Sequence, residues 1–272
     1  MASPLLKFAL IGRQSSGKTC MLTALGSTKE TNPEDIFCSL SRNKSLYENC
    51  VAQEDVKKFF TISNSDENNN ANKEEEKIDS YDEMRQRTEE MLENLNKGIL
   101  PEGTRFLSRT AFIYNFSTSS KTQFDVAIFD YAGELVSNKQ RIPNVTEAEQ
   151  QKEKNVLSQK LLEFFEKMNG LIVAVEICES DDEEIIRKHS LELQDTIEFF
   201  KAIENEGGDK ARFNIPVSLI ITKFDKFENF DFDEYFNRGS AYLDEIRDKY
   251  FATKCGRCIR DLAKQIESVT EK

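Results

Sequence analysis

The chain has 272 residues, of which 38% are hydrophobic and 32% are charged, and its formal net charge is −12. This length suffices for one large domain or two small ones with a buried core. The acidic balance argues against a nucleic-acid surface and against broad contact with anionic lipid, and no segment is long and apolar enough to form an integral membrane segment.

The N-terminal part combines one apolar strand with a long polar region. Residues 5–12 (LLKFALIG) predict a buried strand, and residues 17–27 predict a helix. Residues 28–103 show no strand signal, and the low-complexity stretch 64–77 offers no apolar surface to bury. Residues 78–98 have apolar side chains along one helical face and predict a helix that ends at its final glycine.

The remainder of the chain alternates between strands and helices. We expect a hairpin of 108–117 and 122–133, strands at 170–177 and 214–225, helices at 147–169 and 183–208, and helical structure from Phe232 onward. This alternation predicts an α/β fold with a mostly parallel sheet, helices on both faces and one antiparallel strand. We place the main domain at 1–27 and 104–272, with 28–103 as a helical, low-complexity insertion.

The cysteines give little sign of a metal site. They are Cys20, Cys38, Cys50, Cys178, Cys255 and Cys258. Only the last two form a close pair, and the single histidine, His189, lies on a different expected element. We therefore expect two thiols on a C-terminal helix. With no visible signal peptide, the pattern favours a reducing, cytoplasmic location.

The segment GRQSSGKTC, residues 12–20, fits the pattern G-x-x-x-x-G-K-[S/T]. An apolar strand precedes it and a helix follows it, so its backbone N–H groups would surround a β-phosphate. Lys18 would reach the β- and γ-phosphates, and the Thr19 hydroxyl would bind Mg²⁺. A plain strand-to-helix turn would not need this Lys-Thr pair. The nucleotide-binding residues expected here are Gly12, Gln14, Ser15, Ser16, Gly17, Lys18, Thr19 and Cys20.

The segment DYAG, residues 130–133, follows the second strand of the expected hairpin. It therefore lies at the carboxyl end of a strand, where open α/β sheets bind ligands. Asp130 would hold Mg²⁺ through a water, and the Gly133 N–H could meet the γ-phosphate. A simple strand-ending turn would have the same sequence.

The segment TKFD, residues 222–225, also follows an apolar strand. The Asp225 carboxylate can accept hydrogen bonds from guanine N1–H and N2–H₂, whereas adenine presents the wrong pattern. Lys223 can lay its alkyl stem along the base, and Thr222 completes the motif. A solvated loop could have this sequence by itself. Three motifs in this order on three strand ends favour a magnesium-bound guanine nucleotide.

With these motifs the chain resembles the translation-factor-related class of P-loop GTPases, which includes the Ras-like proteins. The resemblance covers residues 5–27 and about 104–225. GRQSSGKT is similar to the phosphate loop, DYAGE to switch II and TKFD to the guanine-specificity motif. PEGT and DYAGE are also similar to bacterial GTPase-like domains of conflict or signalling systems, and GRQSSGKT to the loop of dynamin-like GTPases.

The resemblance implies a switch I threonine that closes on Mg²⁺ and the γ-phosphate. Thr104 is the first candidate and Thr110 the second, although either would also suit the start of a strand. Gly133 and Glu134 fall in the switch II motif. Glu134 stands where Ras-like proteins carry a glutamine that orients the attacking water, and a carboxylate offers no amide donor. Slow or altered hydrolysis is therefore expected.

Two further departures concern the base-supporting loop and the insertion. The loop position corresponds only to FATKC, residues 251–255, with no clear strand before it. The insertion 28–103 occupies the connection where G-protein α subunits carry a helical domain and an arginine finger. Arg105 or Arg109 could supply such a finger, or both could be ordinary strand residues.

The expected function is a GTP-binding switch with weak GTP hydrolysis that binds GTP or GDP with Mg²⁺. Its partner would be a protein effector, bound through the switch segments or the acidic insertion. A nucleotide-binding scaffold without useful catalysis is one alternative, and a self-assembling dynamin-like GTPase is another. An ATPase is disfavoured because Asp225 is suited to guanine.

Overall fold

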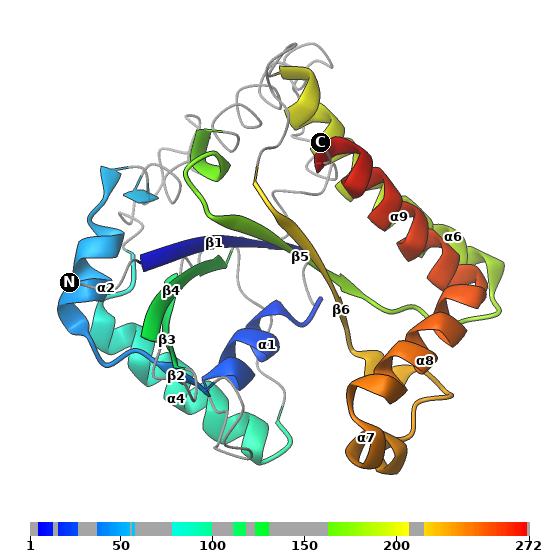
Figure 1. Cartoon of the computed structure of the whole chain (residues 1–272), viewed down its shortest axis with the longest axis horizontal. Helices are drawn as coiled ribbons and strands as arrows, with labels where there is room; N and C mark the ends of the chain where they lie inside the picture. The colour runs from blue at the N-terminus through cyan, green and yellow to red at the C-terminus, as the bar shows by residue number, and fades with distance from the viewer. Residues whose placement is uncertain are drawn as a thin grey trace, which may run out of the picture.

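In the computed structural model, the residues described are 5–12, 16–26, 37–54, 56–57, 78–99, 111–117, 123–130, 163–206 and 215–270. They form an α/β structure (Figure 1). Its strands are β1 (Leu5–Gly12), β2 (Phe37–Leu40), β3 (Ala111–Ser117), β4 (Gln123–Asp130), β5 (Gly170–Glu176) and β6 (Val217–Thr222). Its helices are α1 (Lys18–Leu25), α2 (Lys44–Val51), α4 (Tyr81–Asn96), α6 (Glu183–Glu206), the 3₁₀ turn η4 (Phe224–Lys226), α7 (Phe232–Arg238), α8 (Ser240–Ala252) and α9 (Lys254–Thr270).

The six strands form one sheet in the order β2-β3-β4-β1-β5-β6. Strands β4, β1, β5 and β6 pair in parallel, and β3 pairs antiparallel with β4 and with β2. Because β2 is antiparallel to β3, it points the same way as the other four. Among the described strands β3 alone runs in the opposite direction, which confirms the expected mostly parallel sheet with one antiparallel strand.

Strand β2 corrects the expectation that residues 28–103 contain no strand. Its four residues, Phe37–Leu40, pair with β3, and Cys38 is buried. FCSL is too short to show a clear alternation, and it becomes a strand because β3 offers it an edge to pair with. Residues 37–40 are therefore part of the sheet rather than of a purely helical insertion.

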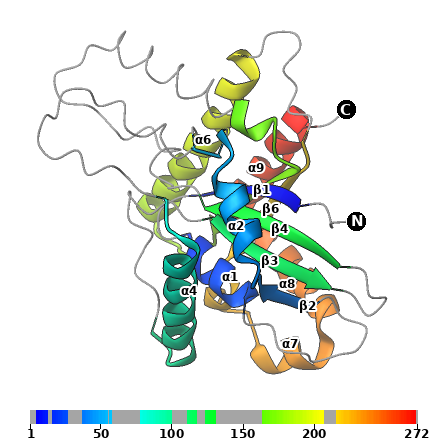
Figure 2. The same cartoon turned by 90° about the vertical axis from the view of Figure 1, so that its left-hand side faces the viewer.

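Helices cover both faces of the sheet, as expected. Along β1, Ala9 and Ile11 contribute to one core and Leu10 to the other. The first core includes buried residues of α6, α8 and α9, and the second includes Leu22 of α1. In Figure 1, β6 passes between α1 and the neighbouring helices α6 and α9, and Figure 2 shows α1 beside α4.

Helix α4 confirms the helix expected at 78–98. Ser80 and Glu83 form a capping box, in which the Ser80 N–H donates to Glu83 Oε2 at 2.7 Å and the Glu83 N–H to Ser80 Oγ at 3.3 Å. Gly98, with φ of 74°, follows the helix end. The Tyr81 hydroxyl donates to Ser41 O at 3.2 Å. The helix start is therefore tied to the residue that follows β2.

The other expected elements are confirmed where they are described. The hairpin strands, the strands β5 and β6, the helix α6 and the helical C-terminal part are all present. Of the helix expected at 147–169, residues 163–165 are helical and contain buried Phe164 and Phe165. Residues 166–169 form turns and bends, so the helix ends earlier than expected, and 147–162 lie outside the described residues. None of the helices that the structure describes is long and apolar enough to cross a membrane.

The junction of α8 and α9 requires glycine at position 256. A Cβ atom there would lie 1.9 Å from Tyr250 O and 2.9 Å from Phe251 Cα. Gly256→Ala should therefore lower the free energy of unfolding by about 2–3 kcal/mol, because backbone atoms must move apart. Urea unfolding would measure the loss. The matched control is Gly26→Ala, whose new Cβ has its nearest contact at 3.4 Å, and an unchanged stability of Gly256→Ala would contradict the prediction.

Candidate functional site

The three predicted motifs meet at one edge of the sheet. Gly12 ends β1, Asp130 ends β4 and Thr222 ends β6, and these three strands point the same way. In the pairing of β1 with β4, Leu10 lies opposite Asp130, and in the pairing of β1 with β5, Gly12 lies opposite Ala174. Segments that lie about 90 residues or more apart in sequence therefore converge at the carboxyl edge, where α/β sheets bind ligands.

Two glycines shape the loop between β1 and α1. A Cβ on Gly12 would lie 2.4 Å from Ala174 O, so only glycine allows β1 and β5 to approach this closely at the loop start. Gly17 has φ of 82° and is the N-cap of α1. Among the residues predicted to bind phosphate in this loop, Gln14 and Ser15 lie outside the described residues.

Lys18 is a buried cation at the start of α1. Its side chain is 5% exposed, and its Nζ donates to Gly12 O at 2.8 Å. Burial lowers the pKa of Lys18, and the neighbouring Asp130 carboxylate opposes this shift. A further anion near Nζ would stabilise the charged ammonium in this partly desolvated position.

Ser16 adds a second polar group to the same loop. It is 3% exposed, and its Oγ has no hydrogen-bond partner within the part of the chain that the structure describes. Buried hydroxyl groups normally have partners, and a bound molecule is one way to supply them.

Thr19 and Asp130 bring two side-chain oxygen atoms close together. The Thr19 hydroxyl donates to Asp130 Oδ2 at 3.4 Å, and Asp130 is 3% exposed. Hydroxyl and carboxylate oxygens suit Mg²⁺, which commonly takes one or two protein ligands and completes its shell with phosphate and water. No group of three or more His, Cys, Asp or Glu residues that could hold a metal occurs among the described residues. The pair therefore fits a partial Mg²⁺ shell of this kind, but not a site made of protein ligands alone.

Thr222 connects the third motif to the phosphate loop. Its hydroxyl lies 2.6 Å from Ser16 O and 3.2 Å from Val175 O, and it can donate to either carbonyl. Its side chain also faces Gly17, because a Cβ atom added to that glycine would lie 3.5 Å from Thr222 Cβ. The TKFD segment is thus fixed against the loop and against β5.

Glu176 was missed by the sequence analysis. It ends β5, and its Oε1 forms ion pairs with Lys223 Nζ at 2.8 Å and Lys226 Nζ at 3.4 Å. Lys223 has a left-handed backbone with φ of 56°, uncommon for a residue with a side chain. The carboxylate therefore helps to position Lys223. An acidic residue ending the apolar run GLIVAVE was the available signal.

Cys20 lies near Lys223, on the first turns of α1. Burial raises the pKa of the Cys20 thiol, and the positive charge of Lys223 opposes that rise. The charge of the TKFD lysine therefore acts on the helix that begins at the phosphate loop.

Asp225 is exposed on η4, while the aromatic residues around it are anchored. Phe224 and Phe227 contact the Tyr250 ring edge-on, with centroid distances of 5.6 and 5.3 Å. The Tyr250 hydroxyl donates to Cys178 O at 3.2 Å and accepts from Cys178 N at 3.1 Å. Tyr250 therefore supports the TKFD loop, and the Asp225 carboxylate is open to a ligand.

Residues 251–255 form a junction between helices. Helix α8 ends at Ala252 and α9 begins at Lys254, with Cys255 buried. As expected, no strand precedes this segment in the described region 223–254. The expected pair of thiols, Cys255 and Cys258, indeed lies on the C-terminal helix.

The remaining predicted site residues lie outside the described part of the chain. They are Thr104, Thr110, Gly133, Glu134, Arg105 and Arg109. Their roles stay predictions from sequence.

Comparison with known proteins adds no assignment. The chain matches no protein-family model, and no curated protein sequence matches it significantly.

Proposed function

We propose that this protein is a P-loop GTPase of the translation-factor-related class, which binds GTP or GDP with Mg²⁺ and acts as a switch with slow hydrolysis. The observation that supports it best is the link between two distant motifs. The Thr222 hydroxyl, beside the proposed base-reading residues, lies 2.6 Å from a carbonyl of the phosphate loop. The proposed phosphate site and the proposed base site are thereby joined by a direct contact.

The phosphate end of the ligand would bind at the loop and the start of α1. Lys18 would exchange its contact with Gly12 O for the β- and γ-phosphates, whose charge compensates the burial of the ammonium. The N–H groups of the loop and of the first turn of α1 would add hydrogen bonds. Thr19 and Asp130 would hold Mg²⁺, which neutralises charge on the phosphate oxygens.

The base end would bind at the TKFD segment. Asp225 would accept from guanine N1–H and N2–H₂, two donors that adenine does not present together. The alkyl stem of Lys223 would lie along the ring while Glu176 holds its ammonium. These roles make guanine the preferred base.

The switch itself would involve residues predicted from sequence. Thr104 would close on Mg²⁺ and the γ-phosphate, and the Gly133 N–H would sense that phosphate. Glu134 would contact the attacking water as an acceptor only, which favours slow turnover. A protein effector would recognise the ordered segments when GTP is bound.

The direct test is nucleotide binding by the wild-type chain. Fluorescent GTP and ATP analogues should be titrated with and without Mg²⁺, and phosphate release should be followed in the same samples. We expect GTP to bind at least about a hundredfold more tightly than ATP, because a site that pairs with one base leaves polar groups unpaired with the other. Equal affinities would refute the guanine assignment. Tight GTP binding without phosphate release would favour the scaffold alternative.

A further inference from the structure

Helix α7 presents two large aromatic side chains to solvent. Phe232 is 57% exposed and Phe236 is 78% exposed, and their spacing of four residues puts them on one face. All seven residues of α7 are described, and none of them is buried. The helix therefore contributes no buried side chain to the core, and its two phenylalanines are available for contact.

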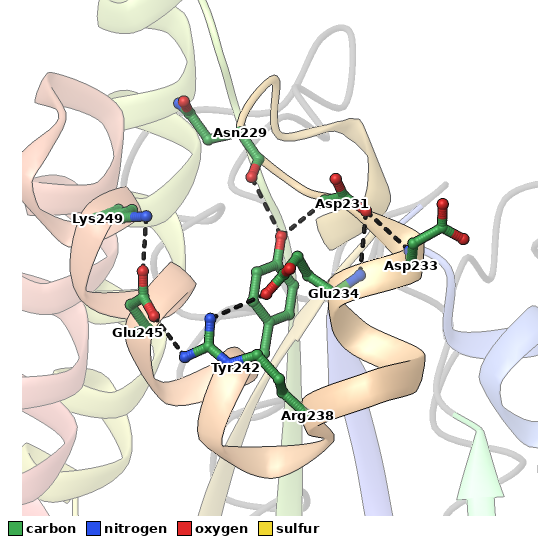
Figure 3. Close-up of polar contacts among 8 residues, drawn as sticks. All are labelled: Asn229, Asp231, Asp233, Glu234, Arg238, Tyr242, Glu245 and Lys249. Atoms are coloured by element: carbon green, nitrogen blue, oxygen red, sulfur yellow. Dashed lines mark hydrogen bonds and ion pairs between the residues drawn. The ribbon is translucent and has the colours of Figure 1, made fainter.

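A polar network holds α7 rigidly in place (Figure 3). The Asp231 Oδ1 accepts from the N–H groups of Asp233 and Glu234, at 2.8 and 3.1 Å, which caps the helix. The Tyr242 hydroxyl accepts from the Asp231 N–H at 2.5 Å and donates to Asn229 O at 3.2 Å. These bonds fix the start of α7 to α8.

The end of α7 is fixed in the same way. Arg238 forms ion pairs with Glu234 at 3.0 Å and with Glu245 at 2.7 Å, and its guanidinium lies over the Tyr242 ring. Lys249 pairs with the same Glu245 at 2.8 Å. The aromatic pair is therefore presented on an ordered helix, so little backbone freedom remains to be lost on binding.

The surroundings of the aromatic pair are acidic. Between Lys226 and Arg238 the sequence has no lysine or arginine but has four carboxylates. They are Glu228, Asp231, Asp233 and Glu234, all exposed. We call Phe232, Phe236 and these four residues the α7 patch. Aromatic anchors with a polar rim are typical of protein interfaces, and this acidic rim favours a basic counterpart even though Glu234 is already paired with Arg238.

Helix α9 supplies such a counterpart. Its exposed face carries Lys254, Arg257, Arg260 and Lys264, interrupted by Asp261 and followed by Glu267, while Ile259, Leu262 and Ile266 are buried. We call the four cations the α9 stripe. None of them forms an ion pair with a residue of the described ranges, whereas Arg238, Arg247 and Lys249 of α7 and α8 are all paired. An unpaired basic stripe is unexpected on a chain of net charge −12.

The neighbour of α9 also offers apolar surface. Helix α6 runs beside α9 (Figure 1), and its Leu191 and Ile185 are 55% and 49% exposed. Helix α8 separates α7 from α9 along the chain, and in Figure 1 the two lie at different sides of it. The acidic, aromatic surface and the basic surface therefore face outward at different places.

We propose that the α7 patch of one molecule docks on the α9 stripe of a second copy. The contact is head-to-tail, because the two surfaces are different. In a dimer the molecule that docks through its α7 patch keeps its α9 stripe free, and its partner keeps its α7 patch free, so further copies can add. The overall negative charge opposes association, but at physiological ionic strength charges more than about 8 Å apart are largely screened. The opposite charges of the α7 patch and the α9 stripe meet at shorter range across the contact and are screened less.

The test is the state of association of the full chain, by sedimentation velocity from about 1 to 200 µM at 0.15 M salt, a range in which weak specific contacts are populated. We expect the sedimentation coefficient to rise with concentration and to fall again at 1 M salt. Phe236→Ser and the double variant Phe232→Ser/Phe236→Ser should weaken association by about tenfold or more, as loss of a central aromatic anchor does. Arg257→Glu/Arg260→Glu should do the same through the other surface.

A mixing experiment distinguishes this specific contact from nonspecific association. The Phe232→Ser/Phe236→Ser variant has an intact stripe, and Arg257→Glu/Arg260→Glu has an intact patch. Their mixture should form one-to-one dimers and nothing larger, although neither associates alone. The control Ile99→Ser removes a comparably exposed apolar residue, 53% exposed, at the end of α4 and should behave as wild type.

Several results would overturn the proposal. A wild-type chain that stays monomeric up to 200 µM would do so, as would variants that associate like wild type. A mixture that fails to form dimers would exclude the head-to-tail geometry. Circular dichroism of each variant checks folding, and none of these results depends on nucleotide binding.

Discussion

Replacing Lys18 by methionine should weaken GTP binding by at least about a hundredfold. Lys18 is 5% exposed, its ammonium donates to Gly12 O at 2.8 Å and is acted on by the Asp130 carboxylate, and the β- and γ-phosphates are proposed to bind there. Charge-assisted hydrogen bonds of this kind contribute about 1.5–3 kcal/mol each, and 2.7 kcal/mol corresponds to about a hundredfold. Equilibrium titration with a fluorescent GTP analogue measures the change.

Methionine is chosen because it keeps most of the volume of the buried stem. The matched control is Lys226→Met, which removes an exposed lysine held only by a 3.4 Å ion pair to Glu176 and should change the affinity by less than about twofold. If Lys18→Met binds GTP as tightly as the wild type, the loop is not a phosphate site. A thermal unfolding curve for each variant confirms that a loss of binding is not a loss of fold.

Replacing Asp225 by asparagine should reverse the preference for the base. In the proposed site the carboxylate would accept two hydrogen bonds from guanine, whereas the asparagine amide offers one acceptor and one donor. Xanthine presents N1–H and a C2 carbonyl, which match the amide. GTP should therefore bind about a hundredfold more weakly to Asp225→Asn, and XTP correspondingly more tightly than to wild type. Competition between the two nucleotides for one fluorescent probe measures both changes together.

Glu176→Gln is the comparison variant for Asp225→Asn. Glutamine loses the ion pairs with Lys223 and Lys226, which are partly exposed, so we expect only about a two- to fivefold loss. The loss should be the same for GTP and XTP, because Glu176 positions a lysine and does not contact the edge of the base. A variant of Asp225 that weakens both nucleotides equally would show that this residue does not select the base.

The main strands and helices could be predicted from the sequence because the patterns that indicate them are local. Strands β1, β5 and β6 are largely apolar runs, and α4 begins with Ser80 and Glu83 in a capping box. Strand β2 was missed because FCSL becomes a strand only beside the edge of β3. Its conformation depends on tertiary pairing rather than on propensity.

The residues of the candidate site also fall into two groups, those that a sequence motif could identify and those that only the fold could. The residues with a motif, such as Lys18, Asp130 and Thr222, could be identified because strand ends collect at one edge of a parallel sheet. Glu176 could not, because its partners are known only once β5 and β6 are placed side by side with Glu176 level with Thr222. The support of the TKFD loop by Tyr250 likewise depends on how α8 packs, which no short pattern encodes.

The hydrogen bond from Thr222 to Ser16 O has a consequence for how a nucleotide would be captured. It sets the spacing between the proposed base and phosphate subsites before any ligand arrives. Once one end of a nucleotide is seated, the other end is presented to its own subsite at a high effective concentration. The two half-sites would then act as a chelate, so a whole nucleotide should bind far more tightly than the separate affinities of a nucleoside and of free triphosphate would suggest.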